Sequence, residues 1–178
     1  VLRLPDQTDV DAVLSALQQA QPSDPERWLA ALDLAFVRAP ELRAVDIVRR
    51  GAKQLPELER ASFLREVSRR AERTSRADVS LWALQALRDE AQAGRSASLS
   101  GMDETRLRET ALAAGDTAEA VAAQLRQVRR LTTGSDARRG ALIDLVRIEA
   151  AWSRTTSATL LERWRTLRGE WAAGAVFD

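Results

Sequence analysis

Apolar residues recur at the spacing of an α-helix along almost the whole chain, and this pattern most narrows what the chain can fold into. Two stretches show it best: Val10, Val13, Leu14 and Leu17 near the start, and Leu160, Trp164, Leu167 and Trp171 near the end. The second set follows the i, i+4, i+7, i+11 spacing of a helix packed lengthwise on another. Strands instead alternate apolar and polar residues, and no sustained alternation occurs. The sequence therefore predicts an all-α fold.

Prolines, glycines and serine-rich stretches divide this pattern into separate helices. We expect a single domain, 1–178, with a leading helix at 8–20 and helical hairpins at about 25–54, 57–93, 103–132 and 136–173. The serine-rich stretch at about 94–102 is predicted to be a flexible loop. Because short links make neighbouring helices antiparallel, the hairpins are expected to stack as a short α-solenoid. The alternative is a compact irregular helical bundle.

Several residues are typical of helix ends. Asp24 precedes Pro25, and Ser75 precedes Asp78 by three residues, so both Asp24 and Ser75 are expected to cap helices. In the stretch ALAAGDTAEAVAA, Gly115 is expected to take the left-handed conformation and Asp116 to cap the next helix. The Gly-Asp pair is therefore predicted to be an elbow between two helices rather than a catalytic loop.

The hairpins resemble the tetratricopeptide-type helical repeat, whose unit has an early aromatic residue, a Gly-Asp elbow, small residues in its second helix and a final proline. The matching residues are Trp28, Ala44, Gly51 and Pro56 in one hairpin, and Leu107, Gly115, Asp116 and Ala120 in another. The first of these hairpins has Ala39-Pro40 where the family has its elbow. The resemblance implies a protein that binds other proteins or peptides, usually on the concave face made by the first helices.

Composition argues against catalysis. The chain has no His, Cys or Tyr, which removes the most common general base, thiolate metal ligands and a frequent general acid. The carboxylates are scattered, and Glu66 and Glu162 each have arginines three or four residues away, typical of surface pairs. We therefore expect no enzyme activity, no catalytic or metal site and no cofactor. No apolar run is long enough to cross a membrane.

Charge is nearly balanced at +1, but its sign alternates between successive blocks of the chain. All but one of the 27 basic residues are arginine, a bias that indicates a GC-rich, bacterial genome. Arg-Arg pairs occur at 49–50, 69–70, 129–130 and 138–139. Three of them lie near predicted helix C-termini, where the dipole favours cations. Since helix ends account for these arginines, nucleic acid is not the expected partner. Peripheral association with a membrane is left as an open alternative.

The five tryptophans are the strongest candidates for contact residues. Trp28, Trp82 and Trp152 are expected in the core, whereas Trp164 and Trp171 lie on the last predicted helix, with no following helix to cover it. The predicted partner-binding residues are Arg163, Trp164, Arg168 and Trp171, and the stretch from Ser96 to Gly101 is a second patch.

The predicted function is a protein–protein interaction scaffold or adaptor that links subunits of a larger assembly. The alternative is a regulatory or nucleic-acid-binding helical domain that uses arginine-rich surfaces. The chain begins at Val1 without an initiator Met, so we take exported, periplasmic, membrane-peripheral and cytoplasmic locations all to be open.

Overall fold

A computed structural model describes residues 12, 15–16, 19, 23–38, 41–97, 99–152 and 154–174. Within these ranges the chain forms helices joined by turns, and no strand is present, so the predicted all-α fold is confirmed. The helices are α2 (Pro25–Arg38), α3 (Glu41–Gln54), α4 (Glu57–Arg73), α5 (Ala77–Gln92), α6 (Gly101–Ala113), α7 (Thr117–Arg130), α8 (Asp136–Ala151) and α9 (Ser157–Gly174). The expected leading helix at 8–20 lies largely outside the described residues.

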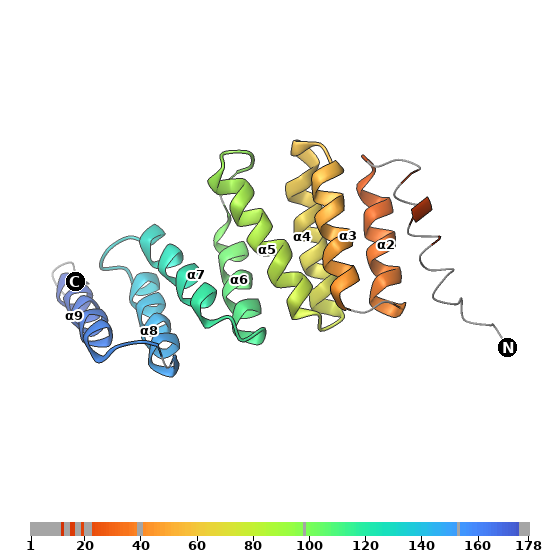
Figure 1. The fold of residues 1–178 in the computed structure, drawn as a ribbon. Helices are drawn as coiled ribbons and strands as arrows, with labels where there is room; N and C mark the ends of the chain where they lie inside the picture. The colour runs from red at the N-terminus through yellow and green to blue at the C-terminus, as the bar shows by residue number, and fades with distance from the viewer. Residues whose placement is uncertain are drawn as a thin grey trace. The chain divides into compact units, whose positions relative to one another are not determined.

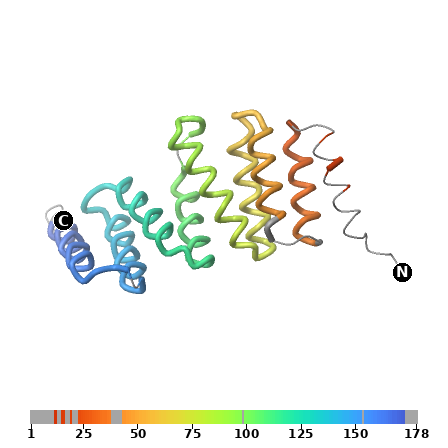
Figure 2. Tube along the Cα trace, in the orientation of Figure 1, coloured from red at the N-terminus to blue at the C-terminus, as the bar shows by residue number. Residues whose placement is uncertain are grey.

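The chain divides into two compact units, Val1–Leu99 and Ser100–Asp178. In the first unit, α2 packs on α3 and α4 packs on α5, so that each pair is an antiparallel hairpin (Figure 1). The two hairpins stack on each other because α4 also contacts α2 and α3, and α5 also contacts α3. The trace in Figure 2 shows the short turn between α4 and α5.

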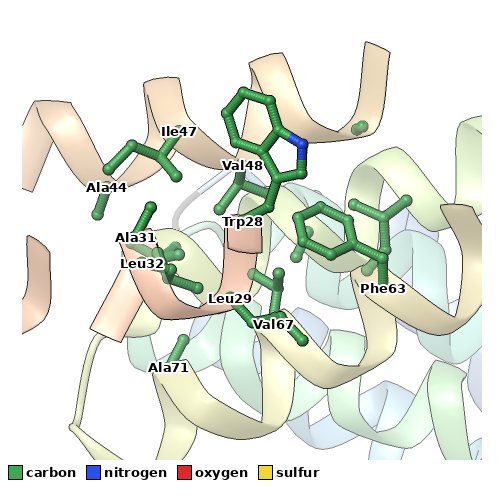
Figure 3. Close-up of a cluster of buried hydrophobic side chains, with 14 of the residues drawn as sticks. Trp28, Leu29, Ala31, Leu32, Ala44, Ile47, Val48, Phe63, Val67 and Ala71 are labelled. Carbon is green, nitrogen blue, oxygen red and sulfur yellow. The ribbon is translucent and has the colours of Figure 1, made fainter. Parts of the chain in front are cut away.

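The core of the first unit forms where three helices meet. Trp28 of α2 and Phe63 of α4 are both buried in this core (Figure 3). Both rings lie close to α3 at Gly51. A Cβ atom at Gly51 would lie 3.0 Å from Phe63 Cζ and 3.0 Å from Trp28 Cγ. The close packing of the two rings therefore leaves room for glycine at position 51 but not for a residue with a side chain.

In the second unit each helix packs on the next one in sequence, α6 on α7, α7 on α8 and α8 on α9. An apolar cluster joins these helices, formed by Val121, Val128, Ala141, Leu142, Leu145 and Leu167. Polar side chains are buried as well. Gln124 of α7 accepts a hydrogen bond from Arg108 Nη1 of α6 (2.8 Å) and donates one to the Ala141 carbonyl of α8 (2.7 Å). Its amide thus links three helices.

A buried carboxylate also joins α6 to α7. Glu104 is 1% exposed, and its Oε2 lies 3.0 Å from Arg126 Nε while its Oε1 lies 3.4 Å from Arg130 Nη2. From the sequence, Asp103-Glu104 indicates only a helix start. Asp103 does fill that role, because it forms a capping box with Ser100, but Glu104 is a buried ion-pair partner.

The turn from α6 to α7 confirms the predicted elbow. Gly115 has a φ of +76°, and Asp116 Oδ1 accepts a hydrogen bond from the Glu119 N–H at 3.1 Å. The Asp116 N–H donates to the Ala111 carbonyl at 2.8 Å, which closes α6 in the manner of a Schellman motif.

The turn from α4 to α5 differs from its prediction. Ser75 does not cap α5: it has a φ of +58°, and Arg76 is the residue that precedes the helix. The Arg76 N–H donates to the Ala71 carbonyl at 2.8 Å, as Asp116 does to Ala111. The turn requires a left-handed residue to close α4, and Ser75 occupies that position. The expected cap of α2 is present, since Asp24 Oδ1 accepts from the Glu26 N–H at 3.0 Å.

Candidate interaction surface

Two ion pairs fix the rotation of α9 against α8. Arg163 Nε of α9 lies 3.2 Å from Oε2 of Glu149, a buried residue of α8. Further along, Glu170 of α9 is 4% exposed and accepts from Arg138 Nε of α8 at 2.7 Å. Leu167 lies between these charges and is buried. The side of α9 that faces α8 therefore carries Arg163, Leu167 and Glu170.

Glu170 keeps its charge despite its burial. Desolvation by itself would raise the pKa of Glu170, but the Gly134 N–H and the Arg138 guanidinium outweigh it, and the pKa lies below its usual value. The ion pair with Arg138 is therefore present at neutral pH and holds α9 in place.

A large apolar surface is left on the outer side of α9. Leu161, Trp164 and Trp171 are 49%, 54% and 49% exposed, and Arg168 is exposed between them. These four residues follow the i, i+3, i+7, i+10 spacing that places side chains on one helix face. We call them the α9 stripe. Two half-exposed indoles on one face are unusual for a surface that meets only water.

The structure brings three of the four predicted contact residues together. Trp164, Arg168 and Trp171 belong to the α9 stripe, whereas Arg163 lies against α8 on its ion pair with Glu149. The lengthwise seam expected from Leu160 to Trp171 is not the buried face, since only Leu167 of that set is buried. The spacing of apolar residues takes no account of charge. The ion pairs Arg163–Glu149 and Arg138–Glu170 instead decide which face of α9 lies against α8.

Leu161 is the stripe residue that sequence reasoning missed. It lies three residues before Trp164, so its spacing alone could have indicated it. Of the other tryptophans, Trp28 is buried, and Trp82 and Trp152 are partly buried against the apolar clusters. The second predicted patch is divided: within 96–101, Leu99 is buried and α6 already begins at Gly101.

The Arg-Arg pairs are engaged within the chain. Each pair places at least one guanidinium on a carboxylate: Arg49 on Asp46, Arg69 and Arg70 on Glu66, Arg130 on Glu104, Arg138 on Glu170 and Arg139 on Asp136. Much of the basic charge is therefore balanced by intramolecular partners, which weakens the case for a phosphate-binding surface.

Within the described ranges, no three acidic residues gather closely enough to hold a metal ion. Among the same residues, no helix combines the length and apolar character needed to cross a membrane. The chain matches no model of a known protein family and no curated protein sequence.

Proposed function

We propose that this chain is a protein–protein interaction module that uses the α9 stripe to hold a partner in a larger assembly. The observation that carries this proposal is the pair of half-exposed indoles, Trp164 and Trp171, on a face that no described helix covers. Tryptophan combines a large apolar area with few rotatable bonds, which makes it the most effective anchor residue in protein interfaces.

The arrangement around the indoles supports a protein partner. Leu161 extends the apolar surface, and Arg168 adds a guanidinium that can stack on a ring or pair with a carboxylate. Three apolar anchors along one helix fit an apolar groove or the apolar face of a partner helix. The resemblance to tetratricopeptide-type repeats also supports protein binding.

The test replaces both indoles with serine, as Trp164→Ser with Trp171→Ser, in the full chain. We expect circular dichroism to be unchanged, because neither side chain packs in the core, and the mass of the native complex to fall to that of the free chain. Leu58→Ser is the matched control, since Leu58 is 96% exposed and lies outside the stripe.

Two results would contradict the proposal. The first is a doubly substituted chain that stays folded and captures its partner as well as the unchanged chain does. The second is an equal loss of capture in the Leu58→Ser control. Retention on heparin that salt abolishes, without any effect of the tryptophan changes, would support the nucleic-acid alternative instead.

A further inference from the structure

The first unit has a cleft that is lined by residues of α3, α4 and α5. Its volume is about 380 Å³, at the small end of the range for binding pockets, and it holds one or two side chains rather than a large ligand. The lining residues on which its chemistry depends are Arg49, Lys53, Trp82 and Ala86, together with the carboxylates Asp89 and Glu90. We call this cleft the α3/α5 groove.

The groove offers apolar surface beside its charged side chains. The partly buried Trp82 and Ala86 of α5 provide this surface, whereas Leu64 of α4 is fully buried and exposes none of it. The Arg49 guanidinium lies 5.8 Å from the centre of the Trp82 ring, at cation–π distance. An apolar group in the groove would therefore contact the Trp82 indole, which already has the Arg49 guanidinium beside it.

The acidic residues of the groove are already neutralised. Asp89 Oδ1 lies 2.8 Å from Arg88 Nη2. Glu90 Oε2 lies 3.0 Å from Arg60 Nη1 and 3.1 Å from Arg95 Nε. The hydrogen bond from Arg95, stronger than the opposing effect of burial, holds the pKa of Glu90 below its usual value, so the two ion pairs of Glu90 persist at neutral pH. These carboxylates leave little negative charge to repel an acidic ligand.

Lys53 supplies charge that is not balanced. It is the only lysine of the chain, it is exposed, and it lies in the last turn of α3. Among the described residues that line the groove, Arg49 pairs with Asp46 and Arg60 with Glu90, whereas Lys53 has no carboxylate within ion-pair distance. One unbalanced ammonium beside an apolar cleft suits one carboxylate better than the row of phosphates of a nucleic acid.

We propose that the α3/α5 groove binds a short acidic segment of a partner protein, with an aliphatic side chain against Trp82 and Ala86 and a carboxylate side chain beside Lys53. This binding site is separate from the α9 stripe, because it lies in the other unit and uses different residues. The chain would then hold one partner segment in each unit.

The test uses three short peptides with acetylated and amidated ends. The first has one leucine flanked by glutamates, the second replaces the glutamates with lysines, and the third replaces the leucine with glycine. Reductive ¹³C-methylation labels the single lysine, and ¹⁵N-labelled tryptophan reports each indole separately. We expect the first peptide to shift the Lys53 and Trp82 signals and the other two to bind at least about tenfold more weakly.

Charge reversal at Lys53 provides the second measurement. Lys53→Glu is expected to weaken binding of the first peptide by at least about tenfold, with Lys53→Gln in between. The matched control is Arg129→Glu, which also reverses an exposed cation in the last turn of a helix, but in α7. We expect it to leave peptide binding unchanged.

Any one of four outcomes would overturn this inference. The first peptide could leave the Lys53 and Trp82 signals in place, or the lysine peptide could bind equally well. Oligothymidylate could also move those signals while the peptides do not, which would assign the groove to single-stranded nucleic acid. A peptide that moves only Trp164 and Trp171 overturns the groove assignment and leaves the α9 stripe standing, so the two proposals fail separately.

Discussion

Gly51 shows how one missing side chain determines the packing of three helices. Gly51→Ala adds a Cβ atom 3.0 Å from carbons of Phe63 and Trp28, two rings held in the core. Overpacking of this kind typically costs about 1–3 kcal/mol, more than the helix propensity gained from alanine. We therefore expect a lower free energy of unfolding for Gly51→Ala, measured by urea denaturation.

The matched control is Gly140→Ala, in the second turn of α8, where an added Cβ atom meets nothing within 4 Å. Here only the propensity changes, so we expect stabilisation by about 0.5–1 kcal/mol. Equal effects of the two alanines, in either direction, would contradict the packing described at Gly51.

Glu104 illustrates a buried charge at the same scale. Glu104→Gln keeps the size of the side chain but removes the anion from Arg126 and Arg130. We expect the free energy of unfolding to fall by roughly 1–3 kcal/mol, because the Arg126 guanidinium loses its buried carboxylate and keeps only the pair with Glu119. The exposed Glu109, changed to glutamine, is the control and is expected to change stability by less than about 0.5 kcal/mol. A Glu104→Gln chain as stable as the control would show that the buried pair contributes nothing net.

At the scale of elements, two turns share one backbone conformation but differ in sequence. Ser75 and Gly115 both have a positive φ. In each turn the N–H of the next residue donates to a carbonyl in the last turn of the preceding helix, Arg76 to Ala71 and Asp116 to Ala111. A serine pays a conformational penalty there that a glycine does not. We expect Ser75→Gly to stabilise the first unit by about 0.5–1 kcal/mol and Gly115→Ser to destabilise the second by a similar amount.

Urea denaturation followed by circular dichroism measures both changes. Thr133→Gly, in the exposed turn between α7 and α8, shows the effect of added chain flexibility alone. If Ser75→Gly were destabilising to the same extent as that control, the left-handed turn at Ser75 would not be strained.

These turns also show what could be predicted from the sequence. Gly115-Asp116 indicates its elbow because glycine favours the left-handed conformation and aspartate favours a cap. Ser75 indicates a helix cap because serine is common at that position, and nothing in the local sequence reveals that the chain needs a left-handed residue there. The helices followed from apolar spacing, whereas the rotation of α9 did not, since it depends on Glu149 and Glu170, which find their arginines only in the folded chain.

The candidate surfaces were predictable to different degrees. Trp164 and Trp171 are large aromatic residues on one predicted helix, and the structure leaves both half-exposed. The α3/α5 groove could not be found from the sequence, because Lys53 and Trp82 come from different helices and meet only when the hairpins stack. Local patterns identify residues of one helix, and long-range packing decides which helices share a site.

At the scale of the whole molecule, stability is expected to respond to acid but not to pH changes near neutrality. Arg70 donates a hydrogen bond to Glu66 and lowers the pKa of that carboxyl. The pKa of Glu170 is also below its usual value, as described above. A carboxylate whose pKa is lower in the folded chain stabilises that chain fully above its unfolded pKa, near 4.5, and loses this effect as the pH falls through its folded pKa. The chain has no histidine or cysteine to titrate near neutrality.

We therefore expect the urea midpoint to be nearly constant from about pH 6 to 8 and to fall below about pH 4.5. In Glu170→Gln the midpoint is lower at neutral pH, and its difference from the unchanged chain should narrow as the pH falls. Glu162→Gln, at an exposed position of α9, is the control and should follow the unchanged chain throughout. A midpoint that is constant down to pH 3, or that changes near pH 6.5, would contradict this prediction.

The polar links of the second unit have a consequence for how such a chain can be rearranged. In repeat proteins with uniform apolar interfaces, hairpins can be duplicated or transposed, because any unit fits any neighbour. Here Gln124 donates to a carbonyl of α8, and Arg138 of α8 donates to the Val128 carbonyl near the end of α7. A transposed hairpin would leave these groups without their hydrogen-bond partners. The order of α6 to α9 is therefore determined by their polar side chains as well as by the connecting turns.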